Sequence, residues 1–343
     1  MPAVATPLPP LGLHSLIGLW QFTPWLALAW ALRSCVLAAY AWGMTTVARA
    51  HPARPWPWWR GLAFLGGLAV IVVAVDSSVG AYDDELFAAH MAQHLLLLAV
   101  APALLLAGRP ALLLMHACRN PWHTWTKNAL RHPIVTALTF PPIGMALYVA
   151  VVVGTHLSSF MNLTLTNPLV HDGEHLLYLA TGYLFYLTAI GGEPIRWRLT
   201  FPAQFAMLAF AMAVDAFTGV VLMQTNYVMF PAYAAIHRTW GPSLLADLHL
   251  GGAIMWVGGD AIMALVLLTL ALQVIRGTRP MDNPRWIEQV RAQTLLGSTE
   301  PTGRPSRNLD TDAAVLDAYN RRLAGLNQQP PDGHDRAPIR RDR

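Results

Sequence analysis

The sequence predicts an all-α integral membrane protein with seven transmembrane helices, its N-terminus outside the cell and its C-terminus inside. Three observations predict this fold class. Hydrophobic residues make up 55% of the 343 residues and charged residues only 12%, which leaves too little polar surface for a soluble globule of this size. Seven apolar stretches reach the roughly 20 residues that a helix needs to cross about 30 Å of hydrocarbon. Basic residues gather in alternate connections between these stretches.

The seven expected spans follow one another without a separate soluble domain between them. They lie near residues 24–47, 60–80, 87–107, 133–156, 171–191, 203–225 and 249–275. Residues 1–23 are then an extracytoplasmic segment, 24–276 the transmembrane domain and 277–343 a cytoplasmic tail. The tail is rich in Arg, Asp, Pro and Gly, so it cannot bury enough apolar surface to offset the entropy of ordering, and we expect it to be largely disordered.

The charges in the connections set the expected orientation. Basic residues lie between spans one and two, between spans three and four, and after span five. They are Arg49, Arg54, Arg60, Arg109, Arg119, Lys127, Arg131, Arg196 and Arg198. The alternate connections hold Asp83, Asp84 and Glu85 and, between spans six and seven, only Arg238 as a basic residue. The basic side is therefore expected to be cytoplasmic. Membrane topology explains the net charge of +4, so the expected partner is the lipid bilayer and not nucleic acid.

Two pairs of histidines are placed for metal binding. His90 and His94, in the run HMAQH, lie four residues apart where span three begins, so one helical face presents both imidazoles. His171 and His175, in HDGEH, repeat this spacing at the start of span five. Odd-numbered spans all start on the outer side, so both pairs are expected at the same membrane face.

Further donors are expected at the same face. His156 ends span four there, and Asp247 and His249 lie at the mouth of span seven. Imidazole suits copper, zinc and iron, and copper leads the divalent affinity order. The thioethers of Met91, next to His90, and of Met255 on span seven would favour Cu(I). The structural alternatives are histidines that bond water and carbonyl groups at a helix mouth, and a methionine that only packs. The candidate metal ligands are His90, His94, His171, His175, Asp247, Met91, His249 and His156.

Three ionisable residues lie at one depth within the expected spans. Arg33 in span one, Asp215 in span six and Asp260 in span seven are about 15 Å from the outer ends by helical rise. Isolated charge is costly there, so each should face the bundle interior, and we expect Arg33 to pair with one or both aspartates. Asp76, near the outer end of span two, is open to either group, the charges or the outer donors. The cluster either fixes the order of the helices or takes part in moving a proton or a cation beneath the metal site.

Four runs of sequence carry a resemblance to a known family. They are HMAQHLLLLAVAPALLLAGRP at 90–110, HDGEHLLYLATGYLFYLTAIGGEP at 171–194, FPAY at 230–233 and DLHLGGAIMW at 247–256. From about Trp20 to Arg276 the chain resembles the CtaG family of cytochrome c oxidase assembly factors, the multi-span type first associated with caa-type oxidases.

The resemblance implies a metallochaperone rather than an enzyme. Such a protein helps to deliver copper to the CuB centre of haem-copper oxidase subunit I, which would be its partner together with other oxidase assembly factors. Its location would be the bacterial inner membrane, as a multi-pass protein. The ligand role falls on His90, His94, His171, His175 and Asp247. Ligands at a solvent-accessible rim would suit both binding and release of the ion.

Three other functions stay open from the residues alone. A copper importer would need ligands that continue toward the basic side, where Met212, Met223 and Met263 lie in spans but no polar ladder is seen. A b-type haem protein for electron transfer would place its axial histidines within the bundle, so we expect copper and not haem. An intramembrane hydrolase would need the glutamate of an HExxH motif, which HMAQH lacks.

Overall fold

The computed structural model describes residues 8–12, 15, 18–20, 24–53, 55–118 and 121–276, and these form helices joined by short connections. No strand occurs among these residues. In chain order the elements are α2 (Pro24–Ala50), α3 (Trp58–Asp76), α4 (Ser78–Tyr82), α5 (Phe87–Leu95), η1 (Leu96–Val100), α6 (Ala101–Ala107), α7 (Pro110–Ala117), α8 (Trp122–Leu130), α9 (Pro133–Leu138), α10 (Pro141–His156), α11 (Phe160–Thr166), α12 (Pro168–Ile190), α13 (Phe201–Gln224), η2 (Pro231–Ile236), α14 (Leu244–Ala253), η3 (Ile254–Gly258) and α15 (Gly259–Ile275). The expected tail at 277–343 and most of the expected N-terminal segment lie outside the described residues.

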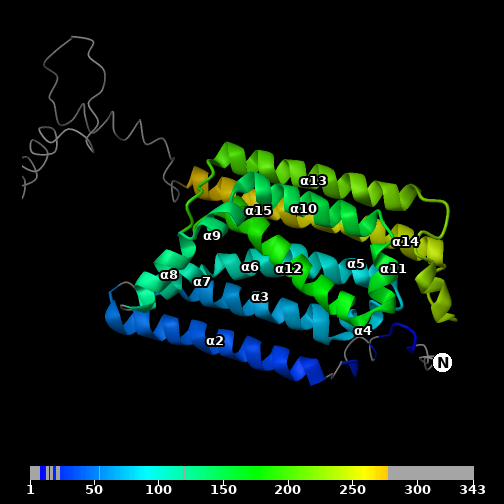
Figure 1. The fold of residues 1–343 in the computed structure, drawn as a ribbon, viewed down its shortest axis with the longest axis horizontal. Coiled ribbons are helices and arrows are strands. Elements are labelled where there is room, and N and C mark those ends of the chain that lie inside the picture. The colour runs from blue at the N-terminus through cyan, green and yellow to red at the C-terminus, as the bar shows by residue number, and fades with distance from the viewer. Residues whose placement is uncertain are drawn as a thin grey trace, which may run out of the picture. The chain divides into compact units, whose positions relative to one another are not determined.

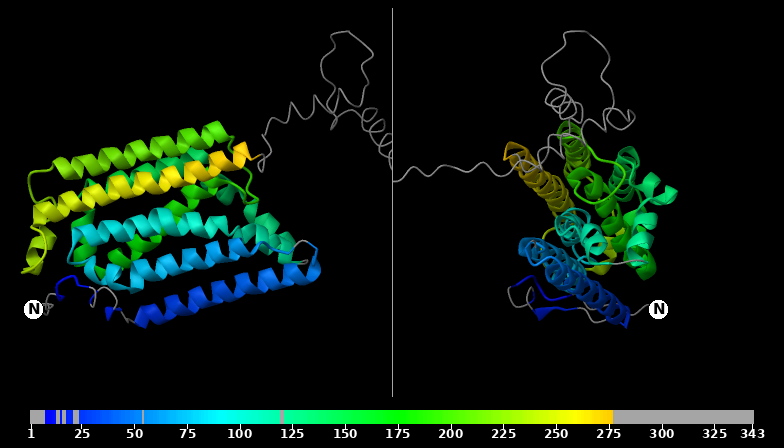
Figure 2. Two further views of the ribbon diagram at one scale, coloured as in Figure 1. Left: turned by 180° about the vertical axis from the view of Figure 1, so that it is seen from behind. Right: turned by 90° about the vertical axis from the view of Figure 1, so that its left-hand side faces the viewer.

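The long helices run side by side (Figure 1). One end of this bundle holds α4, α11 and the start of α14, and the other end holds α7, α8 and α9. Figure 2 shows the bundle from behind and along its helices. The helix α2 packs against α3 and α7 through a small core around Tyr40 and Phe64, and its outer face exposes Leu28, Leu32 and Trp42. An apolar face turned outward in this way is what contact with lipid requires.

Within the described residues, five helical stretches are long and apolar enough to cross a membrane. They are Ala27–Ala50, Trp58–Tyr82, Phe87–Ala117, Phe201–Gln224 and Leu244–Ile275. The helices α10 and α11 add a sixth only if this pair, bent by 71°, counts as one span. The helix α12 coincides with the fifth expected span but carries Asp172 and Glu174 in its first turns. The helical class is therefore confirmed, whereas the count of seven spans and the orientation stay predictions.

Proline and capping residues explain where the helices begin. The expected span at 133–156 is divided at Phe140, whose backbone is extended (ψ 123°), because the residue before a proline avoids the helical region. Asn167 caps α12 by accepting a hydrogen bond from Leu169 N at 3.0 Å, and Pro168 follows at the first helical position, where its missing N–H costs nothing. These two residues fix the start of the helix that carries the second histidine pair.

Glycine lets α12 lie directly on the third helical stretch. A Cβ atom on Gly182 would lie 2.0 Å from the carbonyl oxygen of Leu98, a distance that no side chain can occupy. Since Leu98 belongs to η1, directly after α5, this contact brings α12 against the helix that carries His90 and His94. The close approach therefore places the two histidine pairs opposite each other.

Candidate metal centre

The helix α5 receives its cap from another part of the chain. Leu86, which precedes it, offers no side-chain cap, and the carboxylate of Asp247 on α14 accepts the backbone N–H groups of Phe87 at 2.9 Å and Ala88 at 3.1 Å. A carboxylate at a helix N-terminus satisfies unpaired donors and suits the helix dipole. Asp247 thus anchors the helix that presents His90 and His94, and both of its oxygens are engaged in doing so.

Glu174 lies between the two imidazoles of α5. Its Oε2 is 3.4 Å from Nε2 of His90 and its Oε1 is 3.4 Å from Nε2 of His94. These contacts are too long for good hydrogen bonds. Two ligand atoms bound at about 2.0–2.1 Å to a tetrahedral ion lie roughly 3.4 Å apart. The spacing is therefore that of ligands around one ion, and the three ligand atoms lie within 4.8 Å of one another.

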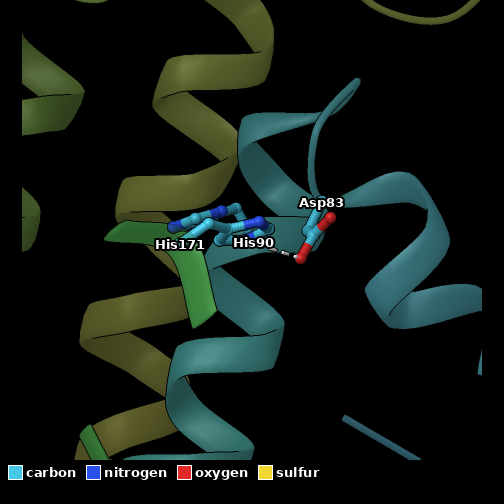
Figure 3. Close-up of side chains that lie close together, drawn as sticks. All are labelled: Asp83, His90 and His171. Atoms are coloured by element: carbon cyan, nitrogen blue, oxygen red, sulfur yellow. Dashed lines mark ion pairs between the residues drawn. The ribbon is translucent and has the colours of Figure 1, made fainter. Parts of the chain in front are cut away.

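Asp83, His90 and His171 form a second group of the same kind, also with ligand atoms within 4.8 Å of one another. Figure 3 shows the rings of His90 and His171 beside the carboxylate of Asp83, with His171 coming from α12. Nε2 of His171 lies 3.2 Å from Oδ2 of Asp83, and the two rings are nearly parallel, with centroids 5.7 Å apart. His90 belongs to both groups, so they form one continuous cluster of Asp83, His90, His94, His171 and Glu174, which we call the outer cluster.

The buried polar atoms of the outer cluster lack hydrogen bonds within the described part of the chain. Both ring nitrogens of His90 and of His94, Nε2 of His171, and both carboxylate oxygens of Asp83 and of Glu174 are buried without such a partner. Buried polar groups are nearly always hydrogen-bonded, because removing them from water unpaired costs about 1–3 kcal/mol each. A cation bound among these atoms would take the carboxylate oxygens and one lone-pair nitrogen of each ring as ligands, so the residues fit a metal ion.

The surroundings hold Asp83 in place. The hydroxyl of Tyr233 donates to the backbone oxygen of Asp83 at 3.0 Å, and burial raises the pKa of this phenol well above its ordinary value, so it stays a neutral donor. Beside Asp83, Asp84 lies 3.7 Å from Nδ1 of His171 with its side chain 60% exposed.

The outer cluster is more enclosed than the sequence predicted. His90, His94 and Glu174 are 0%, 3% and 1% exposed, whereas the ligands were expected at a solvent-accessible rim. Described residues of the N-terminal segment lie at this end of the bundle, since Pro9 accepts a hydrogen bond from Tyr82 and Leu8 accepts one from Trp240. His171, at the edge of the cluster, and the neighbouring His175 are partly exposed and lie next to Asp84.

The remaining predicted ligands occupy three kinds of position. His175 lies at the edge of the cluster, where its Nε2 bonds the amide oxygen of Gln93 at 3.0 Å. His249 bonds the backbone oxygen of Thr225 at 2.9 Å. His156 and Met91 are buried beside His94, around a small cavity described below. The structure thus gathers His90, His94, His171, His175 and His156 at one end of the bundle and gives Asp247 and His249 other partners.

Two ligands of the outer cluster were missed from the sequence. Glu174 lies three residues after His171 and one before His175, so helical spacing places it on their face, and HDGEH already contained the signal. Asp83 lies in the connection between α4 and α5, where no periodicity relates it to the histidines. From the sequence alone, Asp83 indicates only the topology of the membrane helices.

The expected pairing of Arg33 with Asp215 or Asp260 is wrong. Arg33 forms an ion pair with Asp76 at the end of α3, because α2 packs against α3 and α7 whereas α13 and α15 pack against each other. Asp215 accepts hydrogen bonds from the hydroxyl of Tyr148 at 2.8 and 3.0 Å. Asp260 accepts one from the indole of Trp256 at 3.0 Å. The three charges therefore have separate partners.

The fold and the site together define a multi-helix membrane protein with a buried histidine and carboxylate cluster at one end. Sequence comparison gives the particular family. The chain belongs to the cytochrome c oxidase caa3 assembly factor family (Caa3_CtaG), whose sequence model matches residues 38–277. The predicted resemblance is thus confirmed.

Three curated relatives are mycobacterial proteins, each named as uncharacterised. Those of Mycobacterium bovis and Mycobacterium tuberculosis are each 30% identical over 339 residues, which covers 94% of this chain and 46% of theirs. That of Mycobacterium leprae is 30% identical over 249 residues, covering 69% of this chain and 37% of its own. The chain thus spans less than half the length of these relatives. No solved structure matches it.

Proposed function

We propose that the outer cluster binds a copper ion and that the chain passes this ion to a haem-copper oxidase during its assembly, where it supplies the CuB centre of subunit I. The family, whose description names assembly of cytochrome c oxidase, supports the partner. The observation that carries the metal is the buried contact of His90 and His94 with Glu174, whose polar atoms lack hydrogen bonds within the described residues. Other assembly factors of the same oxidase are further proposed partners.

The donor set suits transfer rather than catalysis. Imidazole binds copper well, and a carboxylate tolerates several ions. The outer cluster offers two overlapping triads that share His90, so an ion can exchange between ligand sets without leaving protein donors. The partly exposed His171 would meet the ion first, and the buried triad would hold it. We therefore propose a binding role without enzymatic activity and without haem, at the bacterial inner membrane.

The direct test replaces His90 and His94 together with alanine. The expected result is a protein that still inserts in the membrane but purifies with little copper, measured by mass spectrometry of the metal. Cells that carry this variant as their only copy should make an oxidase depleted in CuB. The matched control replaces His51 and His116, two exposed histidines outside the cluster, and should leave both copper values unchanged.

The outcomes separate delivery from the other functions. A normal CuB content with the double variant would contradict delivery, even if the purified variant lost its metal. Uptake of copper into sealed vesicles by the wild-type protein would favour an importer. A reduced-minus-oxidised spectrum with stoichiometric haem b would replace the copper proposal by an electron-transfer role.

A further inference from the structure

A small cavity of about 20 Å³ lies deeper in the bundle than the outer cluster. Its walls include two imidazoles and two thioethers, those of His94, His156, Met91 and Met255, and its inner side reaches Asp215. The volume corresponds to one water-sized sphere, hence to a single small ion. Of these lining residues only His94 also belongs to the outer cluster.

His156 presents a free ring nitrogen in this region. Its Nδ1 lies 2.7 Å from the backbone oxygen of Val152 and 3.1 Å from the hydroxyl of Thr155. The nearer partner is a carbonyl, which only accepts, so Nδ1 carries the proton. Nε2 then has the lone pair, and it is buried without a hydrogen-bond partner among the described residues. A backbone carbonyl that fixes the opposite nitrogen is the usual support of a metal-binding histidine.

The second imidazole is held at a suitable distance from the first. The ring of His94 stacks on Tyr178 with centroids 3.8 Å apart, and its centroid is 5.5 Å from that of His156, with the planes at 85°. Met91 is 1% exposed and Met255 is 9% exposed, so both thioethers are removed from water. Thioethers are soft donors that select Cu(I), and imidazole also suits copper, so two of each favour a monovalent copper-like ion over Mg²⁺, Ca²⁺ or Mn²⁺.

Two π-helical turns border the same cavity. The turn η1 supplies Leu98 and Ala99 to its wall, and the turn η3 supplies Met255. A π-turn inside an α-helix is rare and is frequently found at functional sites. The extra residue in η3 changes which side chains of the seventh expected span face the cavity. The irregular backbone and the soft donor Met255 therefore lie at the same place.

We propose that this cavity is a second metal site, which takes a soft monovalent cation through His94, His156, Met91 and Met255. It differs from the outer cluster in chemistry, because its donors are neutral, whereas the outer cluster has two carboxylates. His94 is shared, so the two sites are neighbours. The inner site requires only this ligand set, and it stands whether or not the chain serves an oxidase.

The test uses Ag⁺, which is monovalent, soft and inert to redox change. Full-length protein in detergent micelles, with Cys35 and Cys118 replaced by alanine to remove thiols, is labelled with selenomethionine and loaded with Ag⁺. X-ray absorption at the silver edge should show selenium as well as nitrogen neighbours. Silver surrounded by nitrogen and oxygen alone, or no bound silver, would overturn the inner site, and this measurement depends on no variant at the site itself.

Variants then locate the signal. Replacing Met91 and Met255 together with leucine conserves side-chain volume, and should remove the selenium neighbours and weaken Ag⁺ binding at least tenfold. The matched control is Met263→Leu, another buried methionine, which should change neither. A selenium signal that persists in the Met91 and Met255 double variant would overturn the assignment.

A third variant separates this inference from the proposed function. Glu174→Gln with Asp83→Asn removes the carboxylates of the outer cluster only. The expected result is lost copper at the outer cluster with the silver–selenium contact retained. If the silver–selenium contact disappears as well, the inner site has no existence apart from the outer cluster and the inference fails. Copper that stays bound in this variant with nitrogen and oxygen neighbours but no selenium neighbour would instead count against the proposed function.

Discussion

Two buried glutamates lie near the opposite ends of α12, and their surroundings differ. Glu174, near its start, is 1% exposed, and its oxygens have no hydrogen-bond donor among the described residues. Glu193, just beyond its end, is 3% exposed, and accepts the backbone N–H groups of Ala111 at 3.3 Å and Leu112 at 2.9 Å. The comparison shows that burial alone does not indicate a ligand site. A buried carboxylate whose donors are already in place caps a helix, and one that faces only imidazoles is arranged for a cation.

Neutralising Glu174 should have the largest effect on copper. Glu174→Gln keeps the side-chain volume but removes the charge between His90 and His94, so we expect copper affinity to fall about 100-fold or more, beyond the 10- to 100-fold typical of residues that only support a ligand. The metal-free protein should lose no thermal stability, because the change removes a buried charge that no hydrogen bond compensates. Competition with a copper chelator measures the affinity.

The matched control for this variant lies two residues away on the same helix. Asp172 is exposed, and Asp172→Asn should leave copper affinity within about twofold, since isolated surface charges contribute little. Equal affinities for Glu174→Gln and Asp172→Asn would remove Glu174 from the site.

Packing between the two ends of α12 should have the second largest effect. Gly182→Ala puts a methyl group against the carbonyl oxygen of Leu98, so α12 must shift away from α5 and η1. Overpacking of this kind costs about 1–3 kcal/mol, and the displaced Glu174 and His171 should weaken copper binding about tenfold. Thermal unfolding and the chelator competition measure the two effects.

Gly173 provides the control for a glycine on α12. A Cβ atom there meets nothing within 4 Å, so Gly173→Ala should stabilise the helix by about 0.5–1 kcal/mol through reduced backbone entropy of the unfolded chain. Copper affinity should not change. If both alanine variants behaved alike, the close contact at Gly182 would not position the site.

The sequence predicted those parts of the fold that depend on local pattern. Apolar runs of about 20 residues gave the long helices, and Pro141 with Pro142 marks the break before α10. Spacing of four residues put His90 and His94 on one helical face. Because the two helices α5 and α12 start at the same end of the bundle, His171 was expected near them. The same rule included Glu174, which was overlooked.

What the sequence did not predict depends on which helices become neighbours. Arg33 could have met any aspartate at its depth, and only the packing of α2 against α3 selects Asp76. The burial of the outer cluster likewise depends on contacts between distant segments, such as Trp240 with Leu8, which are 232 residues apart. No periodicity encodes such contacts, so ligands were expected at an open rim.

Glu193 should affect stability through pH and leave copper binding unchanged. Burial raises the pKa of Glu193 to about 7, above the value of about 4.3 for an unfolded glutamate. Between these values the folded state binds more protons than the unfolded state, so this group makes stability fall as pH rises from about 4.3 to 7.

Glu193→Gln resembles the protonated acid and removes this contribution. The thermal midpoint of the wild type should therefore fall more between pH 5 and pH 8 than that of the variant. Asp172→Asn should keep the wild-type difference, because Asp172 is exposed. Equal pH dependence in wild type and Glu193→Gln would mean that Glu193 is ionised throughout, held by the α7 N-terminus, and the contrast between the two glutamates would then rest on hydrogen bonding alone.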